Sequence, residues 1–199
     1  MKPRDIVPIL LAAGSSHLLG APRPLARFGR RSALQIALAN CRGLARPILV
    51  LGCDAALIRP HVPRNVHVLL NRRWRSGGQL SSLLAALRHV PPSSAFLLYP
   101  IDQPLLQRHT IQTLVRAFLG RRPHQQIVLP RHGRETGHPI LVSAALRPEF
   151  ATAPTARHVI YKRKSRILQL PVPTTSIFTD FSTPDSYLSC LKKFLSRRG

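Results

Sequence analysis

Short apolar runs alternate with helix-like periods along this chain, and this alternation constrains the fold more than any other feature of the sequence. Several runs are rich in Val, Ile and Leu and are bounded by turn residues, which is typical of buried strands. They occupy residues 6–11, 47–52, 66–70, 95–99 and 126–129. Because helical periods separate these runs, the sequence predicts an α/β fold with a mostly parallel sheet covered by helices.

The helical periods carry recognisable start signals. Ser32 precedes an apolar stretch at 33–41 and is a good N-cap residue. Near the end, Thr183 offers a cap, Pro184 suits the first helical position and Asp185 suits the first turn. Two further helices are predicted from apolar residues three and four positions apart: Leu80, Leu83, Leu84 and Leu87, and then Ile111, Leu114, Val115 and Phe118. We expect residues 1–199 to form a single domain.

The first predicted strand ends in a loop suited to an anion. Glycine lets the backbone approach a phosphate closely, and the amides of the small residues that follow can point at it. The segment reads Leu11, Ala12, Ala13, Gly14, Ser15, Ser16. An ordinary strand-to-helix turn has the same composition, so this segment alone leaves both interpretations open.

Asp102 follows the predicted strand at 95–99, at the sheet edge where ligands of parallel sheets collect. Magnesium binds through one or two carboxylates together with substrate phosphates, so an acid in this place suits a metal-bound nucleotide. The structural alternative is an Asp that opens the turn before Pro104 and caps the next helix.

Two other segments combine small or polar residues with a predicted element. Gly78 and Ser82 lie near a helix start that follows several arginines, which favours anion binding; alternatively, Ser81 or Ser82 caps that helix. Trp74, in the same segment, is expected to be a packing residue. His138 precedes the apolar run at 140–142 and is either a ligand-contacting or a structural histidine.

The chain is strongly basic, with 30 Lys and Arg against 7 Asp and Glu and a formal net charge of +23. Such a field attracts polyanions, but the arginines are spread along the sequence and no nucleic-acid-binding motif is present. We therefore expect no specific nucleic-acid partner. No apolar stretch approaches the roughly 20 residues of a membrane span, so we expect a cytoplasmic protein without a membrane partner. Cys41, Cys53 and Cys190 are expected to be reduced.

Five segments, in this order, resemble the MobA/MocA-like nucleotidyltransferases, and the resemblance extends over nearly the whole chain. They are residues 11–16, residues 78–83, Asp102-Gln103-Pro104, Gly137-His138-Pro139 and residues 180–185. The resemblance implies a three-layer, Rossmann-like sheet of the glycosyltransferase-A or nucleotide-diphospho-sugar transferase type. It also implies that the loop at 11–16 holds the nucleotide, that Asp102 binds Mg²⁺ and that the segment with His138 lies on the acceptor side.

The chain departs from the family pattern at the phosphate loop and near the last helix. Leu18 stands where the family usually has an arginine, and Arg23 stands where it usually has a lysine that holds the triphosphate. Ser182 replaces a second acid, while Asp180 remains as a candidate metal ligand. Arg23 keeps the positive charge but not the compact ammonium geometry.

The resemblance implies transfer of an NMP from an NTP, with CTP or GTP favoured, to a phosphorylated acceptor with release of pyrophosphate. Molybdopterin is a candidate acceptor, and a molybdoenzyme a candidate partner. The expected catalytic residues are Asp102 and Arg23, and the expected metal ligands are Asp102 and Asp180. The expected ligand-binding residues are Leu11, Ala12, Ala13, Gly14, Ser15, Ser16, Gly78, Ser82 and His138. Two alternatives stay open: a non-catalytic nucleotide- or pterin-binding accessory protein for molybdoenzyme maturation, and a basic nucleic-acid-binding protein.

Overall fold

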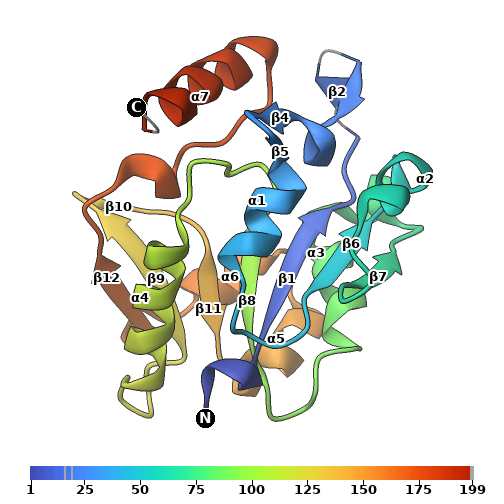
Figure 1. The fold of residues 1–199 in the computed structure, drawn as a ribbon. Helices are drawn as coiled ribbons and strands as arrows, with labels where there is room; N and C mark the ends of the chain where they lie inside the picture. Colours follow the sequence, from blue (N-terminus) through green and yellow to red (C-terminus); the bar gives the residue numbers. More distant parts are fainter. Residues whose placement is uncertain (16, 19, 198–199) are drawn as a thin grey trace.

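The computed structural model of the protein describes residues 1–15, 17–18 and 20–197. Eight strands of this described chain form one mixed sheet in the order β10-β9-β11-β8-β1-β6-β7, with β12 also paired to β9 (Figure 1). Their bounds are β1 Ile6–Ala12, β6 Ile48–Leu51, β7 His67–Leu70, β8 Ala95–Pro100, β9 Ile127–His132, β10 Glu135–Thr136, β11 Ile140–Val142 and β12 Ile167–Pro171.

The central strands of the sheet are parallel, as the alternating sequence pattern predicts. β1 pairs in parallel with β6 on one side and with β8 on the other, and β7 extends the parallel part beyond β6. β11 is antiparallel to both β8 and β9, and β12 is parallel to β9. The predicted α/β fold with a mostly parallel sheet is therefore confirmed.

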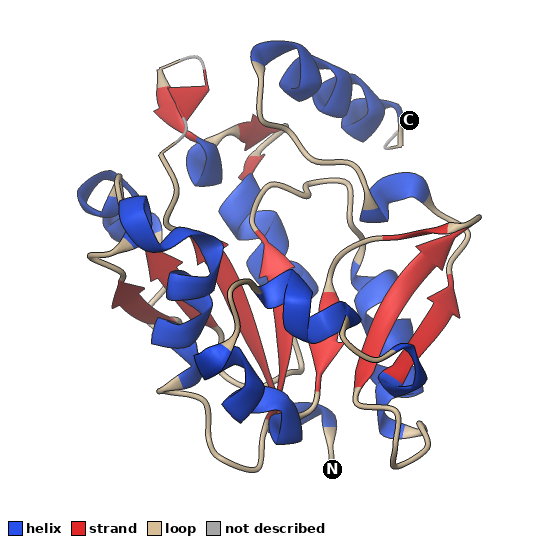
Figure 2. Ribbon diagram, turned by 180° about the vertical axis from the view of Figure 1, so that it is seen from behind, coloured by secondary structure: helices blue, strands red, loops and turns tan. Residues whose placement is uncertain are grey.

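Helices cover both faces of the sheet. Helices α1 (Ala33–Asn40) and α4 (Arg108–Leu119) lie in front of it in Figure 1. The opposite face, which Figure 2 brings forward, carries α3 (Trp74–Leu87), α5 (Arg147–Thr152) and α6 (Ala156–Tyr161). This is the predicted three-layer arrangement. None of the described helices is long and apolar enough to cross a membrane.

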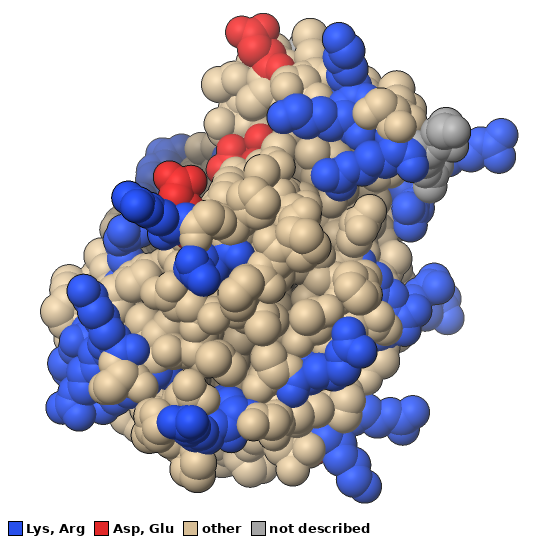
Figure 3. All heavy atoms as spheres, turned by 90° about the vertical axis from the view of Figure 1, so that its left-hand side faces the viewer, with Lys and Arg blue, Asp and Glu red and all other residues tan. Residues whose placement is uncertain are grey.

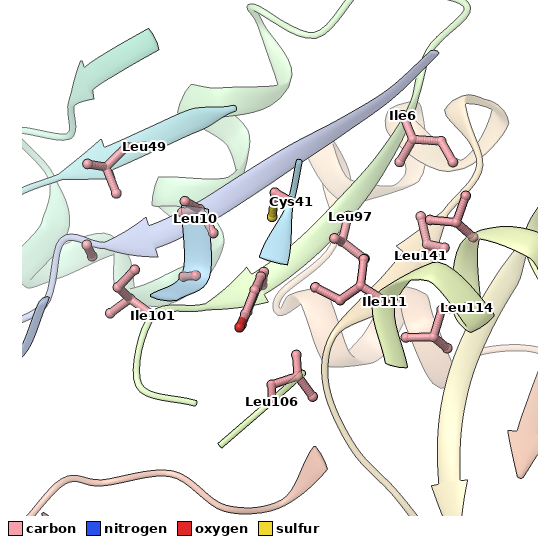
Figure 4. Close-up of a cluster of buried hydrophobic side chains, with 14 of the residues drawn as sticks. Ile6, Leu10, Cys41, Leu49, Leu97, Ile101, Leu106, Ile111, Leu114 and Leu141 are labelled. Atoms are coloured by element: carbon pink, nitrogen blue, oxygen red, sulfur yellow. The ribbon is translucent and has the colours of Figure 1, made fainter. Parts of the chain in front are cut away.

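The core of the sheet consists of two clusters, one on each face, and the side chains of β1 contribute to both. Successive side chains of a strand point to opposite faces, and every residue of β1 is buried. Ile6 and Leu10 pack toward α1 and α4, whereas Val7 and Ile9 pack toward α3, α5 and α6. Figure 4 shows part of the first cluster, in which side chains from several strands meet those of α4 and the buried thiol of Cys41. Burial on both faces explains why β1 reads as a continuous apolar run.

A third, smaller cluster holds the C-terminal helix α7 (Pro184–Ser196) above the sheet edge. Thr183 caps α7 by accepting a hydrogen bond from the Ser186 amide, as its sequence signal predicts. The ring of Phe28 makes edge contacts with Phe181, at 5.1 Å between centroids, and with Phe194, at 5.7 Å. These contacts fix the segment that precedes α7 against the N-terminal part of the chain.

The remaining elements are short. They are α2 Ala55–Ile58, the two-residue strands β2 His17–Leu18, β3 Ala21–Pro22, β4 Arg27–Phe28 and β5 Arg31–Ser32, and the 3₁₀ turns η1 Pro3–Asp5, η2 Arg23–Leu25, η3 Arg59–His61, η4 Ala144–Leu146, η5 Lys164–Arg166 and η6 Thr175–Ile177. Strands β2 to β5 and η2 lie above the carboxyl ends of the central strands in Figure 1, where they border the predicted site.

Candidate active site

The predicted loop and the predicted carboxylate lie at the same edge of the sheet. β1 and β8 are neighbouring parallel strands, and their register pairs Leu11 with Pro100. Gly14 follows Leu11 by three residues and Asp102 follows Pro100 by two, so both lie just beyond the ends of adjacent strands. Ligands of open α/β sheets bind at this edge.

Asp102 is paired with Arg23. The Nη1 atom of Arg23 donates to the Oδ2 atom of Asp102 at 2.9 Å, and the two side chains are 23% and 22% exposed. Burial raises the pKa of the Asp102 carboxyl above its ordinary value, while the Arg23 guanidinium acts in the opposite direction. Asp102 does not cap the next helix, because α4 begins at Arg108 with Gln107 as its N-cap residue; the capping alternative is therefore wrong.

Asp180 lies beside Asp102. The Phe181 amide donates to the main-chain carbonyl of Asp102 at 3.2 Å, and the negative charge of Asp180 helps to raise the pKa of Asp102. The structure thus brings together two predicted metal ligands that lie far apart in the sequence. Two carboxylates suit a hard cation such as Mg²⁺, which fills its other positions with water and substrate phosphates. No cluster of three or more His, Cys, Asp or Glu side chains occurs in the described part of the chain.

The loop after β1 combines a buried stem with an exposed tip. Leu11, Ala12 and Ala13 are buried, whereas Gly14 and Ser15 are exposed. Ser16 lies outside the described residues. Gly52, at the end of β6, supports the stem: a Cβ atom there would lie 2.2 Å from the Ala13 carbonyl oxygen. The Cys53 amide donates to that same oxygen at 3.1 Å.

Helix α3 consists of two helical segments that meet at Gly78, where φ is 56° and the backbone is not helical. The segment after Gly78 is the predicted helix, whereas the short segment that begins at Trp74, before the paired glycines, was not predicted. Neither predicted capping serine begins a helix: Ser81 donates to the Gly78 carbonyl at 2.8 Å, and Ser82 accepts from Asn71 Nδ2 at 2.9 Å.

The two predicted ligand-binding residues of α3 lie in different surroundings. Gly78 is exposed at the kink, but Ser82 is buried against Asn71. Trp74 packs against the core, which confirms that it is a packing residue, and the Arg75 guanidinium lies 5.1 Å from the centre of its ring.

His138 lies in a cavity next to Asp180. Burial lowers the pKa of His138 below its ordinary value, and a hydrogen bond from its ring to the Leu98 main chain opposes this effect. Gln103, 5% exposed, lines the same cavity and donates to the Ile177 carbonyl at 3.1 Å. Sequence reasoning missed Gln103 as a site residue, although its position directly after Asp102 was an available signal.

Basic side chains are scattered over the face of the molecule that Figure 3 shows. In Figure 3, Lys and Arg side chains occur in several separate groups on the face shown, rather than in one continuous stripe. A nucleic-acid interface usually gathers its positive charge on one face or along one helix. The net charge of +23 produces a general positive field around the protein.

The parallel sheet, the loop after β1 and the carboxylates after β8 define the class of α/β proteins with the nucleotide-diphospho-sugar transferase fold. Residues 8–169 match the MobA-like NTP transferase domain, and the chain belongs to this family of nucleotidyltransferases. An NTP substrate is implied by membership in the family.

Solved structures show how closely the fold is shared. Rv0371c from Mycobacterium tuberculosis H37Rv is 26% identical, with a TM-score of 0.80 over 96% of this chain and 100% of that chain. A structure of Rv0371C in complex with manganese is 25% identical, with a TM-score of 0.78 over 94% and 98%. Molybdopterin-guanine dinucleotide biosynthesis protein A from Archaeoglobus fulgidus shares the fold at 14% identity, with a TM-score of 0.64 over 96% and 99%. Comparison with curated protein sequences found no match.

Proposed function

We propose that the protein is a divalent-metal-dependent nucleotidyltransferase that moves an NMP from an NTP to a phosphorylated small molecule. An oxygen of the acceptor phosphate attacks the α-phosphorus of the NTP, the bond to the bridging β-phosphate oxygen breaks, and pyrophosphate leaves. CTP and GTP are the favoured nucleotides. Molybdopterin is a candidate acceptor because the family resemblance includes enzymes that act on it.

The pairing of Arg23 with Asp102 is the observation that carries this proposal. The carboxylate of Asp102 is partly buried, has a raised pKa and forms an ion pair with the Arg23 guanidinium. It lies beside a second acid, Asp180, and follows the strand next to the one that ends in the nucleotide loop. Such a cluster at a ligand-binding edge is a candidate for catalysis rather than for stability. It matches what nucleotidyl transfer needs, namely oxygen ligands for a cation and a positive group for phosphates.

Each residue has a distinct role in this proposal. Exposed backbone amides at Gly14 and Ser15 bind the phosphates, and Arg23 stabilises the negative charge that develops on them. Asp102 and Asp180 hold Mg²⁺, which, when bound, neutralises phosphate charge and makes the α-phosphorus more electrophilic. His138 lies in the cavity beside Asp180 and contacts the acceptor.

A pyrophosphate-release assay with the four NTPs and a panel of phosphorylated acceptors tests this function. The proposal predicts release that requires both an acceptor and a divalent metal. Tight NTP binding without release would instead identify a non-catalytic nucleotide-binding accessory protein. Submicromolar binding to DNA or RNA at 150 mM salt, with no effect of NTP, would favour the nucleic-acid alternative.

A further inference from the structure

A cavity of about 400 Å³ opens beside Asp180. Apolar side chains from β8, β11, α6 and η6 form much of its wall. The cavity is also lined by polar and charged residues, namely Gln79, Gln103, His138, Arg157 and Asp180. Thr136 and Tyr161 border the cavity and are joined by a 3.0 Å hydrogen bond between their hydroxyl groups. The cavity is therefore a built pocket with a few polar groups set among apolar ones, which is the usual composition of a small-molecule site.

Two buried polar atoms of residues that line this pocket have no partner. Oε1 of Gln103 and Nδ1 of His138 make no hydrogen bond with any described residue. The orientation of Gln103 is fixed, because its Nε2 atom donates to the Ile177 carbonyl and only the amide nitrogen can do so. Gln103 Oε1 can therefore only accept a hydrogen bond, whereas Nδ1 of a neutral imidazole either donates or accepts one.

The two unpaired atoms limit the chemistry of an entering group. Buried polar atoms are rarely left unpaired, and a group that donates a hydrogen bond satisfies Gln103 Oε1. A carboxylate or phosphate has no proton to donate to this oxygen. Because both atoms are buried, the entering group must be small. A hydroxyl or a neutral amino group meets all of these conditions.

We infer that the acceptor substrate carries a neutral hydroxyl or amino group, which enters this pocket, donates to Gln103 Oε1 and forms a hydrogen bond with His138 Nδ1. The inference rests on the proposed function, since it assigns the pocket to the acceptor. It names Gln103 and His138 as the residues that determine acceptor specificity.

A matched series of alkyl phosphates tests this assignment without requiring turnover. The series ends in a hydroxyl, a methyl or a carboxylate group, and chain length is varied within each set. Binding is measured by calorimetry in the presence of Mg²⁺, and ¹⁵N NMR of labelled histidine follows the His138 ring. We expect the hydroxyl-ended compounds to bind at least fivefold more tightly than their methyl- and carboxylate-ended counterparts and to shift the Nδ1 signal of His138.

Two variants and two matched controls test whether Gln103 and His138 cause the preference for the hydroxyl end. His138→Phe removes both ring nitrogens at similar size, and Gln103→Met removes the Oε1 acceptor at similar length. Each should weaken binding of the hydroxyl-ended compounds about tenfold while leaving the methyl-ended compounds nearly unaffected. His132→Phe and Gln126→Met make the same changes outside the pocket and should keep the preference. Circular dichroism confirms that each variant is folded.

The outcomes separate this inference from the function on which it rests. Absence of any preference for the hydroxyl end, or failure of the whole series to bind at millimolar concentration, overturns the inference. An equal loss in the control variants overturns it as well. If pyrophosphate release occurs without the preference, the inference alone fails. If the preference is present but the protein does not bind NTP, the proposed nucleotidyl transfer fails.

Discussion

Nη1 of Arg23 lies 2.9 Å from Oδ2 of Asp102, so the proposed phosphate-binding cation is paired with the proposed metal-binding carboxylate. Oδ2 of Asp102 is also one of the two oxygens through which this carboxylate would bind a divalent cation. A bound triphosphate offers Arg23 another anionic partner. Binding of metal and binding of NTP are therefore expected to favour each other, since each releases a group that the other needs.

Replacement of Arg23 by Gln should change metal and nucleotide binding in opposite directions. Without NTP, the affinity for Mn²⁺ should rise about fivefold or more, because the carboxylate loses its competing cation. The affinity for NTP should fall about tenfold, because a charge-assisted contact to phosphate is lost. Electron paramagnetic resonance of free Mn²⁺ and calorimetry of NTP binding measure the two effects. Arg27→Gln is the matched control, since Arg27 donates to the Arg30 carbonyl. Unchanged Mn²⁺ affinity in Arg23→Gln would contradict the coupling.

Substitution of Gly52 by Ala should displace the main chain at Ala13, in the stem of the nucleotide loop. The added Cβ atom would lie 2.2 Å from the Ala13 carbonyl oxygen, and main-chain atoms cannot move aside cheaply. We expect a loss of about 1–3 kcal/mol in the free energy of unfolding, together with weaker NTP binding. Urea denaturation and calorimetry measure these effects. Gly120→Ala, whose Cβ would meet its nearest atom at 3.6 Å, should change neither property. If the two variants behave alike, Gly52 does not support the loop.

Glu149 should contribute stability that disappears in acid. The hydrogen bond from Arg166 is the main reason why the pKa of Glu149 lies below its ordinary value of 4.5, and Lys162, 3.7 Å away, adds to the effect. The pKa of Glu149 is lower in the folded protein than in the unfolded chain, so the unfolded chain binds more protons as the pH falls below 4.5. The stability that the ion pair contributes is therefore present above pH 4.5 and is lost as the pH falls through the pKa of the folded protein.

Glu149→Gln should therefore lower the free energy of unfolding at pH 7 by up to about 1 kcal/mol, as expected for a partly exposed ion pair. The difference from the parent protein should shrink below pH 4.5. Urea denaturation at several pH values measures both effects. Glu135→Gln removes an exposed carboxylate and corrects for the change in net charge. A difference that is constant with pH would show that the ion pair does not cause the loss.

The sequence predicted the centre of the sheet because those strands are buried on both faces. The predicted run at 6–11 corresponds to β1, and the run at 95–99 corresponds to β8. β12 was not predicted: its residues are mostly half-buried or exposed and give no continuous apolar run. A helix start was predicted near the paired glycines, and a helical segment does follow Gly78; the additional segment from Trp74 was not predicted, because it joins the helix across the non-helical backbone of Gly78.

Pairings between distant residues could not be read from the sequence. Arg23 and Asp102 are 79 positions apart, and no local pattern connects an arginine after the loop with a carboxylate after another strand. The family resemblance supplied both residues but not their contact. Gln103 directly follows Asp102 in the sequence, which could have identified it as a site residue, but its contact with the Ile177 carbonyl exists only in the tertiary structure.

Metal-dependent NTP binding by Asp102→Asn tests the central claim most directly. Asn keeps the shape of the side chain but removes the charge that a divalent cation needs. The account predicts that the parent protein binds NTP more tightly with Mg²⁺ than with EDTA, and that Asp102→Asn loses this difference and pyrophosphate release while remaining folded. Asp5→Asn, which alters an exposed carboxylate in η1, should behave like the parent. Equal Mg²⁺-dependent NTP affinity in Asp102→Asn and the parent would contradict the proposed site.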